Sequence, residues 1–151
     1  LRTICDAVRA KDAAAVAALL EAPVPAIRRV DYRGEEEIWA AGEQQVFYLD
    51  ANLEFSEAIP CENDMADQVI RLEHEGEEAV CIHAETPEDG YTISLNNANF
   101  TQLPVVFFSD DETALDSVLF SYNGRALVDR RSLIPEDRLR QVAARYGAVV
   151  I

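Results

Sequence analysis

The sequence predicts a single α+β domain, residues 1–151, built around a mainly antiparallel sheet. The chain has 151 residues, the usual size of one domain, and 49% of them are hydrophobic, enough to form one core. Helical periodicity occurs in a segment near each end and in one short stretch near residue 110. The remaining apolar residues fall mostly in short alternating runs. Successive strands with helices grouped toward the ends are typical of the α+β class.

The helices are predicted from periodicity and from capping residues. Residues 3–21 are rich in alanine and place apolar side chains near helical spacing, and two prolines follow them. Ser109 and Glu112 have the spacing of a capping box, which predicts a short helix over residues 110–117. Residues 135–146 begin with a proline, carry one apolar stripe and are followed by a glycine, so they predict a C-terminal helix.

The strands are predicted from alternation, turn residues and apolar runs. Residues 69–74 and 78–84 alternate on either side of a Glu-Gly-Glu turn, which predicts a β-hairpin. Residues 91–95 alternate as a further strand, and residues 104–108 form a continuous apolar run that predicts a strand covered on both faces. The Asn-Gly dipeptide at residues 123–124 is preferred in hairpin turns. Further strands are predicted at residues 46–49, 118–122, 125–128 and 149–151.

The acidic charge of the chain limits its partners. There are 28 Asp and Glu residues against 13 Lys and Arg residues, a formal net charge of -15. This charge repels phosphate groups, so neither nucleic acid nor a membrane surface is expected as a partner. A basic protein would be attracted, and its association would be accelerated. The alternative is that the charge serves only to keep the protein soluble.

The cysteine pattern indicates a reducing compartment. Cys5, Cys61 and Cys81 are an odd number at wide spacing, which is a poor framework for disulfides. No apolar run approaches the ~20 residues of a membrane span, and the N-terminal segment lacks the apolar core of a signal peptide. A cytoplasmic protein is therefore expected. The leading Leu1 and the apolar last residues suggest that the chain is trimmed.

The motifs of common catalytic sites are not found, so we predict no catalytic residue, no cofactor and no metal ligand. Neither a G-x-S-x-G elbow nor a glycine-rich phosphate loop occurs. The His-Ala-Glu triplet at residues 83–85 matches half of the zinc deaminase motif, but the Cys pair that must follow does not occur. His74 and His83 would lie close together across the predicted hairpin, where Glu73 and Glu85 could add ligands. Two neighbouring surface histidines are the alternative.

Acidic clusters are the remaining candidates for a binding site. None of them has the regular pattern of a calcium loop. One interpretation is that they are solvated turns and helix starts, and the other is that they dock a basic partner. The candidate partner-binding residues are Asp110, Asp111, Glu112, Glu35, Glu36 and Glu37.

One part of the sequence resembles a known family. The stretch "QLPVVFFSDDETAL" (residues 102–115) is similar to the strand and capped helix of the SseB N-terminal-type domain. The later "YNGRALVDRRSLIPEDRLRQVAARYGAVVI" (residues 122–151) is similar in order to the strand, helix and terminal apolar strand that follow in that family. The resemblance over residues 102–151 implies a non-catalytic interaction or secretion-linked domain, and it carries no catalytic residues over.

These observations favour a small acidic protein-interaction domain without enzymatic activity. The function expected first is that of a bacterial immunity protein or inhibitor, which binds and occludes a basic protein partner such as a toxin. An SseB-like secretion-associated or regulatory interaction domain is the second hypothesis. An enzyme with a site built on His74, His83 and nearby carboxylates is the third.

Overall fold

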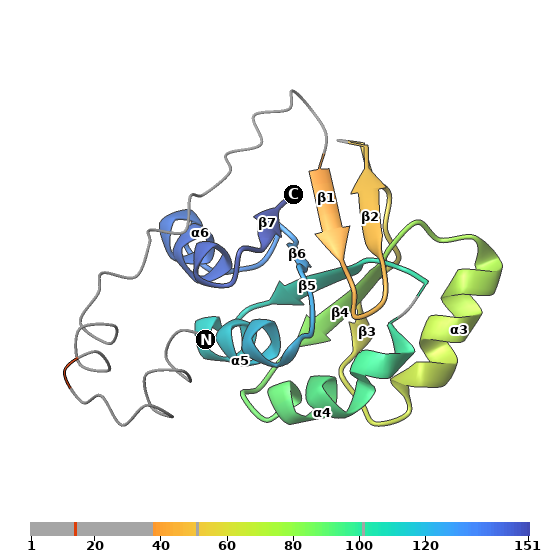
Figure 1. The fold of residues 1–151 in the computed structure, drawn as a ribbon, viewed down its shortest axis with the longest axis horizontal. Coiled ribbons are helices and arrows are strands. Elements are labelled where there is room, and N and C mark those ends of the chain that lie inside the picture. The colour runs from red at the N-terminus through yellow and green to blue at the C-terminus, as the bar shows by residue number, and fades with distance from the viewer. Residues whose placement is uncertain (1–13, 15–37, 51, 101) are drawn as a thin grey trace. The chain divides into compact units, whose positions relative to one another are not determined.

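The computed structural model describes residue 14 and residues 38–50, 52–100 and 102–151 (Figure 1). The predicted helix over residues 3–21 lies outside the described residues except for Ala14, which is helical. Contacts between residues divide the chain into two units, residues 1–33 and residues 34–151, and the description below concerns the second. The expectation of one domain therefore stays a prediction.

A five-stranded parallel sheet forms the centre of this unit. Its strands are adjacent in the order in which they occur in the sequence, β3-β4-β5-β6-β7, and every neighbouring pair is parallel. β4 and β5 are the longest strands and lie next to each other in the middle of the sheet (Figure 1). The strands are β3 (Ile59–Pro60), β4 (Val80–Ala84), β5 (Val105–Ser109), β6 (Leu127–Val128) and β7 (Val149–Val150).

Helices connect the successive strands and lie on one face of the sheet. Each connection leads to the next parallel strand on the same side, and such crossovers are almost always right-handed, so they place their helices on a common face. Buried residues of all four helices share one core cluster with alternate strand residues such as Ile82 and Phe107. The helices are α3 (Met65–Glu75), α4 (Asp89–Asn96, continued by the 3-10 turn η1, Asn97–Asn99), α5 (Glu112–Ser121) and α6 (Glu136–Arg145).

An antiparallel hairpin packs on the opposite face of the sheet. Its strands are β1 (Ile38–Ala41) and β2 (Val46–Leu49). Ala40 of the hairpin shares a second core cluster with Cys81, Val106 and Leu127 of the sheet. Figure 1 accordingly shows the hairpin and α4 on opposite sides of the parallel strands. The sheet is thus covered on both faces, as the continuous apolar run at residues 104–108 predicts.

The prediction of a mainly antiparallel sheet is wrong, because the larger sheet is parallel throughout. Residues 69–74, predicted as a strand, belong to α3, and residues 91–95 belong to α4. Both segments were mistaken for strands because their alternating patterns are short. A few apolar residues two positions apart also occur by chance in a helix. Gly76, predicted in a hairpin turn, ends α3 with φ = 84°, the left-handed conformation that glycine adopts without strain.

The predicted hairpin at residues 118–128 is also wrong. Residues 112–121 form α5, and the chain then reaches β6. The antiparallel neighbour of Arg125 is Ala41 of the hairpin, and the two residues exchange backbone hydrogen bonds of 3.0 and 2.8 Å. Gly124 of the Asn-Gly dipeptide permits a close approach of the hairpin instead: a Cβ atom on Gly124 would lie 2.1 Å from the carbonyl oxygen of Ala41.

The elements that were predicted from the strongest local sequence signals are confirmed. α6 matches the predicted C-terminal helix at 135–146, β2 matches the predicted strand at 46–49, and β7 is an edge strand near the chain's last residue. The short helix at 110–117 exists and extends to Ser121, but its capping residue is Asp111 rather than Ser109. Among the described residues, no helix is long and apolar enough to cross a membrane.

Candidate functional site

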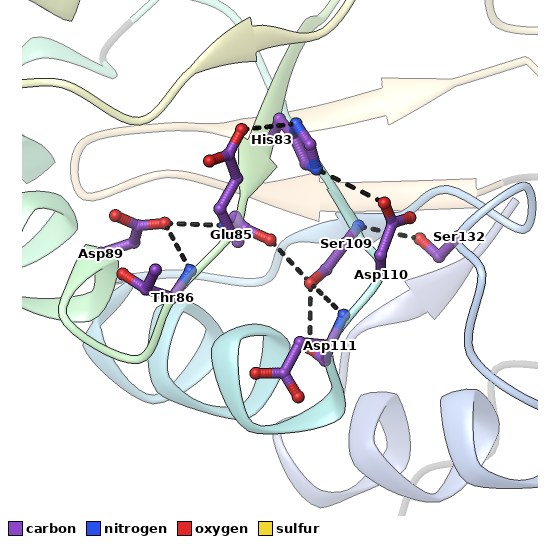
Figure 2. A network of polar contacts seen from close by, with 9 residues as sticks. His83, Glu85, Thr86, Asp89, Ser109, Asp110, Asp111 and Ser132 are labelled. Carbon is purple, nitrogen blue, oxygen red and sulfur yellow. Dashed lines mark hydrogen bonds and ion pairs between the residues drawn. The ribbon is translucent and has the colours of Figure 1, made fainter.

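Two acidic loops meet at the edge of the sheet where the parallel strands end. The register pairs His83 with Phe108 and Ala84 with Ser109, so the residues that follow β4 and β5 emerge side by side. Residues about 25 positions apart in the sequence, such as Glu85 and Asp110, are thereby brought together (Figure 2). We call this group the acidic edge; it consists of Glu85, Glu88, Asp89, Asp110, Asp111 and Glu112.

His83 lies between the two strand ends and contacts both loops. Its Nδ1 atom is 3.4 Å from Glu85 Oε1, and its Nε2 atom is 4.0 Å from Asp110 Oδ2 (Figure 2). Its ring also packs on Phe108, with 5.1 Å between the ring centroids. The carboxylates of Glu85 and Asp110 are both at least half exposed, so a binding partner can reach them.

Asp89 and Asp111 of this edge hold the loops in place. Asp89 Oδ2 accepts the amide hydrogens of Glu85 at 2.7 Å and Thr86 at 3.0 Å. Asp111 accepts hydrogen bonds from the amide of Thr113 at 3.1 Å and from its hydroxyl at 2.6 Å. These bonds to Thr113 hold the pKa of Asp111 below its ordinary value.

Glu112 is neutralised by an arginine from the last helix. Arg138 donates two hydrogen bonds to its carboxylate, at 3.0 and 2.8 Å, in the bidentate geometry that is strongest for such pairs. The hydrogen bonds to Glu112, with its negative charge, raise the pKa of Arg138. Among the described residues that were predicted to bind a partner, Asp111 and Glu112 therefore have structural roles in addition to their charge, and Asp110 is the most exposed of the three.

The serine hydroxyls at this edge are structural. Ser109 is completely buried, and its hydroxyl donates to the carbonyl oxygen of Ala84 at 2.7 Å. Its amide donates to the hydroxyl of Ser132 at 3.1 Å (Figure 2). These bonds tie β4, β5 and the loop after β6 together. A nucleophile must be accessible to its substrate, so Ser109 does not have the environment of a catalytic serine.

A buried carboxylate paired with an exposed arginine follows β6. Asp129 is 2% exposed and accepts hydrogen bonds from the backbone amide and the guanidinium of Arg131, the shortest of them 2.8 Å. The guanidinium lies 5.2 Å from the ring centroid of Phe55. The charge of Asp129 is thus balanced internally and adds little to the field outside the protein.

The structure places the remaining sequence candidates apart. His74 is in the last turn of α3 and His83 is in β4, so the predicted proximity of the two histidines across a hairpin does not occur. Within the described part of the chain, no group of three or more His, Cys, Asp or Glu side chains is arranged to hold a metal ion. Glu35, Glu36 and Glu37 lie outside the described residues.

The edge also differs from the usual ligand site of open α/β sheets. Such sites lie at the carboxyl ends of the strands, where the strand order reverses and neighbouring crossovers diverge to leave a crevice. Among the described strands the order does not reverse, since β3 to β7 follow one another without interruption. At the acidic edge, loops therefore meet at the carboxyl ends of neighbouring strands, without the reversal of strand order that opens a crevice.

The thiols of Cys61 and Cys81 are held in their neutral form. Burial, followed by the charge of Asp89, raises the pKa of Cys61 to about 12. Burial, followed by the charge of Asp129, raises the pKa of Cys81 to about 12. The thiolate is the reactive form of cysteine, so neither thiol has the environment of a nucleophile.

These raised pKa values predict a loss of stability at alkaline pH. A group whose pKa is higher in the folded state stabilises fully below its ordinary pKa, here 9.0, and this contribution is lost as the pH rises toward about 12. We expect the free energy of unfolding, measured by urea denaturation, to fall across this window. The fall should be smaller in Cys81→Ala, which keeps every other group that titrates there. An identical fall in both proteins would contradict the assignment.

In comparisons with protein-family models, with curated proteins and with solved structures, no match to this chain was found. The resemblance of residues 102–151 to the SseB N-terminal-type domain therefore stays a prediction.

Proposed function

We propose that this chain is a non-enzymatic protein-interaction domain that binds a basic partner through the acidic edge, in the manner of an immunity protein or inhibitor. The observation that carries the proposal is the convergence of two acidic loops around His83, with the exposed carboxylates of Glu85 and Asp110 on either side. These loops belong to a stretch, residues 72–124, that contains 11 acidic residues and neither lysine nor arginine.

The distribution of the remaining charges supports this proposal. Residues 38–151 contain 21 acidic and 7 basic residues, a net charge of -14. Five of the seven arginines form ion pairs with carboxylates of the same chain: Arg71, Arg131, Arg138, Arg140 and Arg145. Within residues 38–151 most of the positive charge is therefore paired with carboxylates of the same chain. The excess negative charge produces a field that attracts a basic protein and accelerates its association.

The proposal is tested first by finding the partner. The tagged protein is purified from its native host at low salt, and the proteins that co-elute are identified by mass spectrometry. We expect one stoichiometric basic protein that is released as the salt concentration rises, because salt screens exposed charges. The absence of a specific basic partner would count against the proposal.

The role of the acidic edge is tested by removing its two exposed charges. The double variant Glu85→Gln/Asp110→Asn should slow association with that partner by about tenfold and reduce its dependence on salt, since these carboxylates face the approaching protein. The matched control is Glu73→Gln/Glu77→Gln, which removes the same charge near the start of β4, at the opposite edge of the sheet. Association rates are measured by stopped flow. Equal losses in both variants would show that only the total charge matters.

A further inference from the structure

Exposed apolar side chains lie on the two helices that start at the acidic edge. Tyr91 and Leu95 of α4 are 71% and 59% exposed, and Phe120 of α5 is 76% exposed. Aromatic and large aliphatic side chains gathered on a surface beside charged residues are typical of protein-binding sites. We call Tyr91, Leu95 and Phe120 the apolar helix face.

The two helices lie side by side and run in the same direction. The hydroxyl of Ser117 in α5 donates to the carbonyl oxygen of Pro87, just before α4, at 2.6 Å. At the other end, the side-chain amide of Asn97 donates to the carbonyl oxygen of Ser121 at 2.8 Å. Close packing is possible because the second residue of α4 is a glycine: a Cβ atom on Gly90 would lie 2.1 Å from the Ser117 hydroxyl oxygen. Figure 1 shows both helices beneath the strands, in the layer opposite the hairpin.

The apolar helix face continues directly from the acidic edge. Glu88, Tyr91 and Leu95 are spaced three and four residues apart, so they form one stripe along α4 that begins with a carboxylate. On α5, Phe120 lies about two turns after Glu112 of the acidic edge, and Asp116 between them is paired with Arg145. Both helices follow strands, so both start at the acidic edge. Tyr91 lies in the first turn of α4, and Leu95 and Phe120 lie farther along their helices. The surface therefore has a negative end and an apolar end.

We infer that this surface receives an amphipathic helix of the basic partner, with its lysine and arginine residues over the acidic edge and its apolar stripe on Tyr91, Leu95 and Phe120. The inference rests on the proposed function and specifies the chemistry of the partner. Charge complementarity selects this occupant, because a second copy of this chain would bring a further net charge of -15 to the same surface. The surface is formed by two parallel helices and offers no strand edge, so a helix that packs on their side-chain ridges fits it better than an added strand.

The test uses a synthetic probe and matched variants. The probe is a fluorescent peptide of about 18 residues with leucines at helical spacing and lysines gathered at one end. The comparison peptide has the same composition with its leucines spaced so that they form no helical stripe. Binding is measured by fluorescence anisotropy. The variant Leu95→Ser/Phe120→Ser is compared with Leu133→Ser, which removes an apolar side chain of 76% exposure outside this face.

We expect the amphipathic peptide to bind more tightly than the comparison peptide, and Leu95→Ser/Phe120→Ser to weaken its binding about tenfold. Leu133→Ser should change it less than twofold. Equal binding of both peptides, lost in Glu85→Gln/Asp110→Asn but unaffected by Leu95→Ser/Phe120→Ser, would overturn the helix inference and leave the proposed function standing. Binding of neither peptide at low salt would overturn the inference and also weaken the proposed function. A dimer in sedimentation that Leu95→Ser/Phe120→Ser dissociates would assign the face to self-association instead.

Discussion

The substitution Phe107→Ala is expected to lower the free energy of unfolding by about 3–5 kcal/mol, the range found when a buried aromatic side chain is removed from a core. Phe107 is completely buried and lies in β5, the central strand of the parallel sheet. Its ring contacts Tyr122 edge to face, with 5.8 Å between the centroids. The cavity would open between the sheet and the helices, where the backbone on both sides is held by its neighbours and cannot collapse to fill it.

The matched control for this prediction is Phe120→Ala, the same substitution at a side chain that is 76% exposed. Its cost should be below about 1 kcal/mol, because exposed substitutions away from special features change stability little. Both variants are compared with the unsubstituted protein by urea denaturation. If the two cost the same, the position of Phe107 between the sheet and the helices would be incorrect.

The sequence predicts best those elements whose signals are local. α6 combines a proline at its start, one apolar stripe and a glycine after its end, and its bounds agree with the prediction within one residue. β5 was identified from an uninterrupted apolar run. In both cases every residue that carries the signal lies within the element, so no distant partner is needed to interpret it.

Strand direction is different, because it depends on segments far apart in the sequence. Residues 91–95 place Tyr91, Ile93 and Leu95 two apart, which suggests one face of a strand. In α4, Tyr91 and Leu95 are one turn apart on the exposed side, and Ile93 is buried. When α4 is interpreted as a strand, no helix is predicted between β4 and β5. The parallel pair β4 and β5 is then mistaken for antiparallel neighbours. The residues of β4 were interpreted as one half of an alternating hairpin, although their apolar run, like that of β5, is typical of a parallel sheet.

The candidate site could be predicted only in part. Asp110, Asp111 and Glu112 are consecutive, so their clustering is evident in the sequence. The approach of Glu85 and His83 to Asp110 depends on the parallel register of β4 and β5, which no local pattern encodes. The structural roles of Asp111 and Glu112 likewise require Thr113 and Arg138 to be seen in place. From the sequence one can therefore predict that this edge is acidic, but not which residues of the two loops meet there.

The second large effect is expected from Gly124→Ala, which should detach the hairpin from the sheet. A Cβ atom at this position would lie 2.1 Å from the carbonyl oxygen and 2.9 Å from the carbonyl carbon of Ala41. Both are backbone atoms, so no rotation of a side chain can relieve the clash. The paired hydrogen bonds between Ala41 and Arg125 must then lengthen or break, and the core between the hairpin and the sheet opens. We expect a loss of about 3 kcal/mol or more, as for other severe disruptions of a packed core.

This loss should be accompanied by a local signal, because Trp39 is the only tryptophan in the chain and lies in β1. The guanidinium carbon of Arg125 is 3.9 Å from the centroid of its ring, a contact that displacement of the hairpin would break. Tryptophan fluorescence should therefore change in Gly124→Ala under conditions in which the protein remains folded. The control is Gly76→Ala at the end of α3: its φ of 84° makes alanine unfavourable by about 1 kcal/mol, but nothing lies within 4 Å of the added carbon. Gly76→Ala should lose stability without altering the fluorescence of the folded state. A Gly124→Ala protein with unchanged stability and fluorescence would mean that the hairpin does not pack on the sheet through this contact.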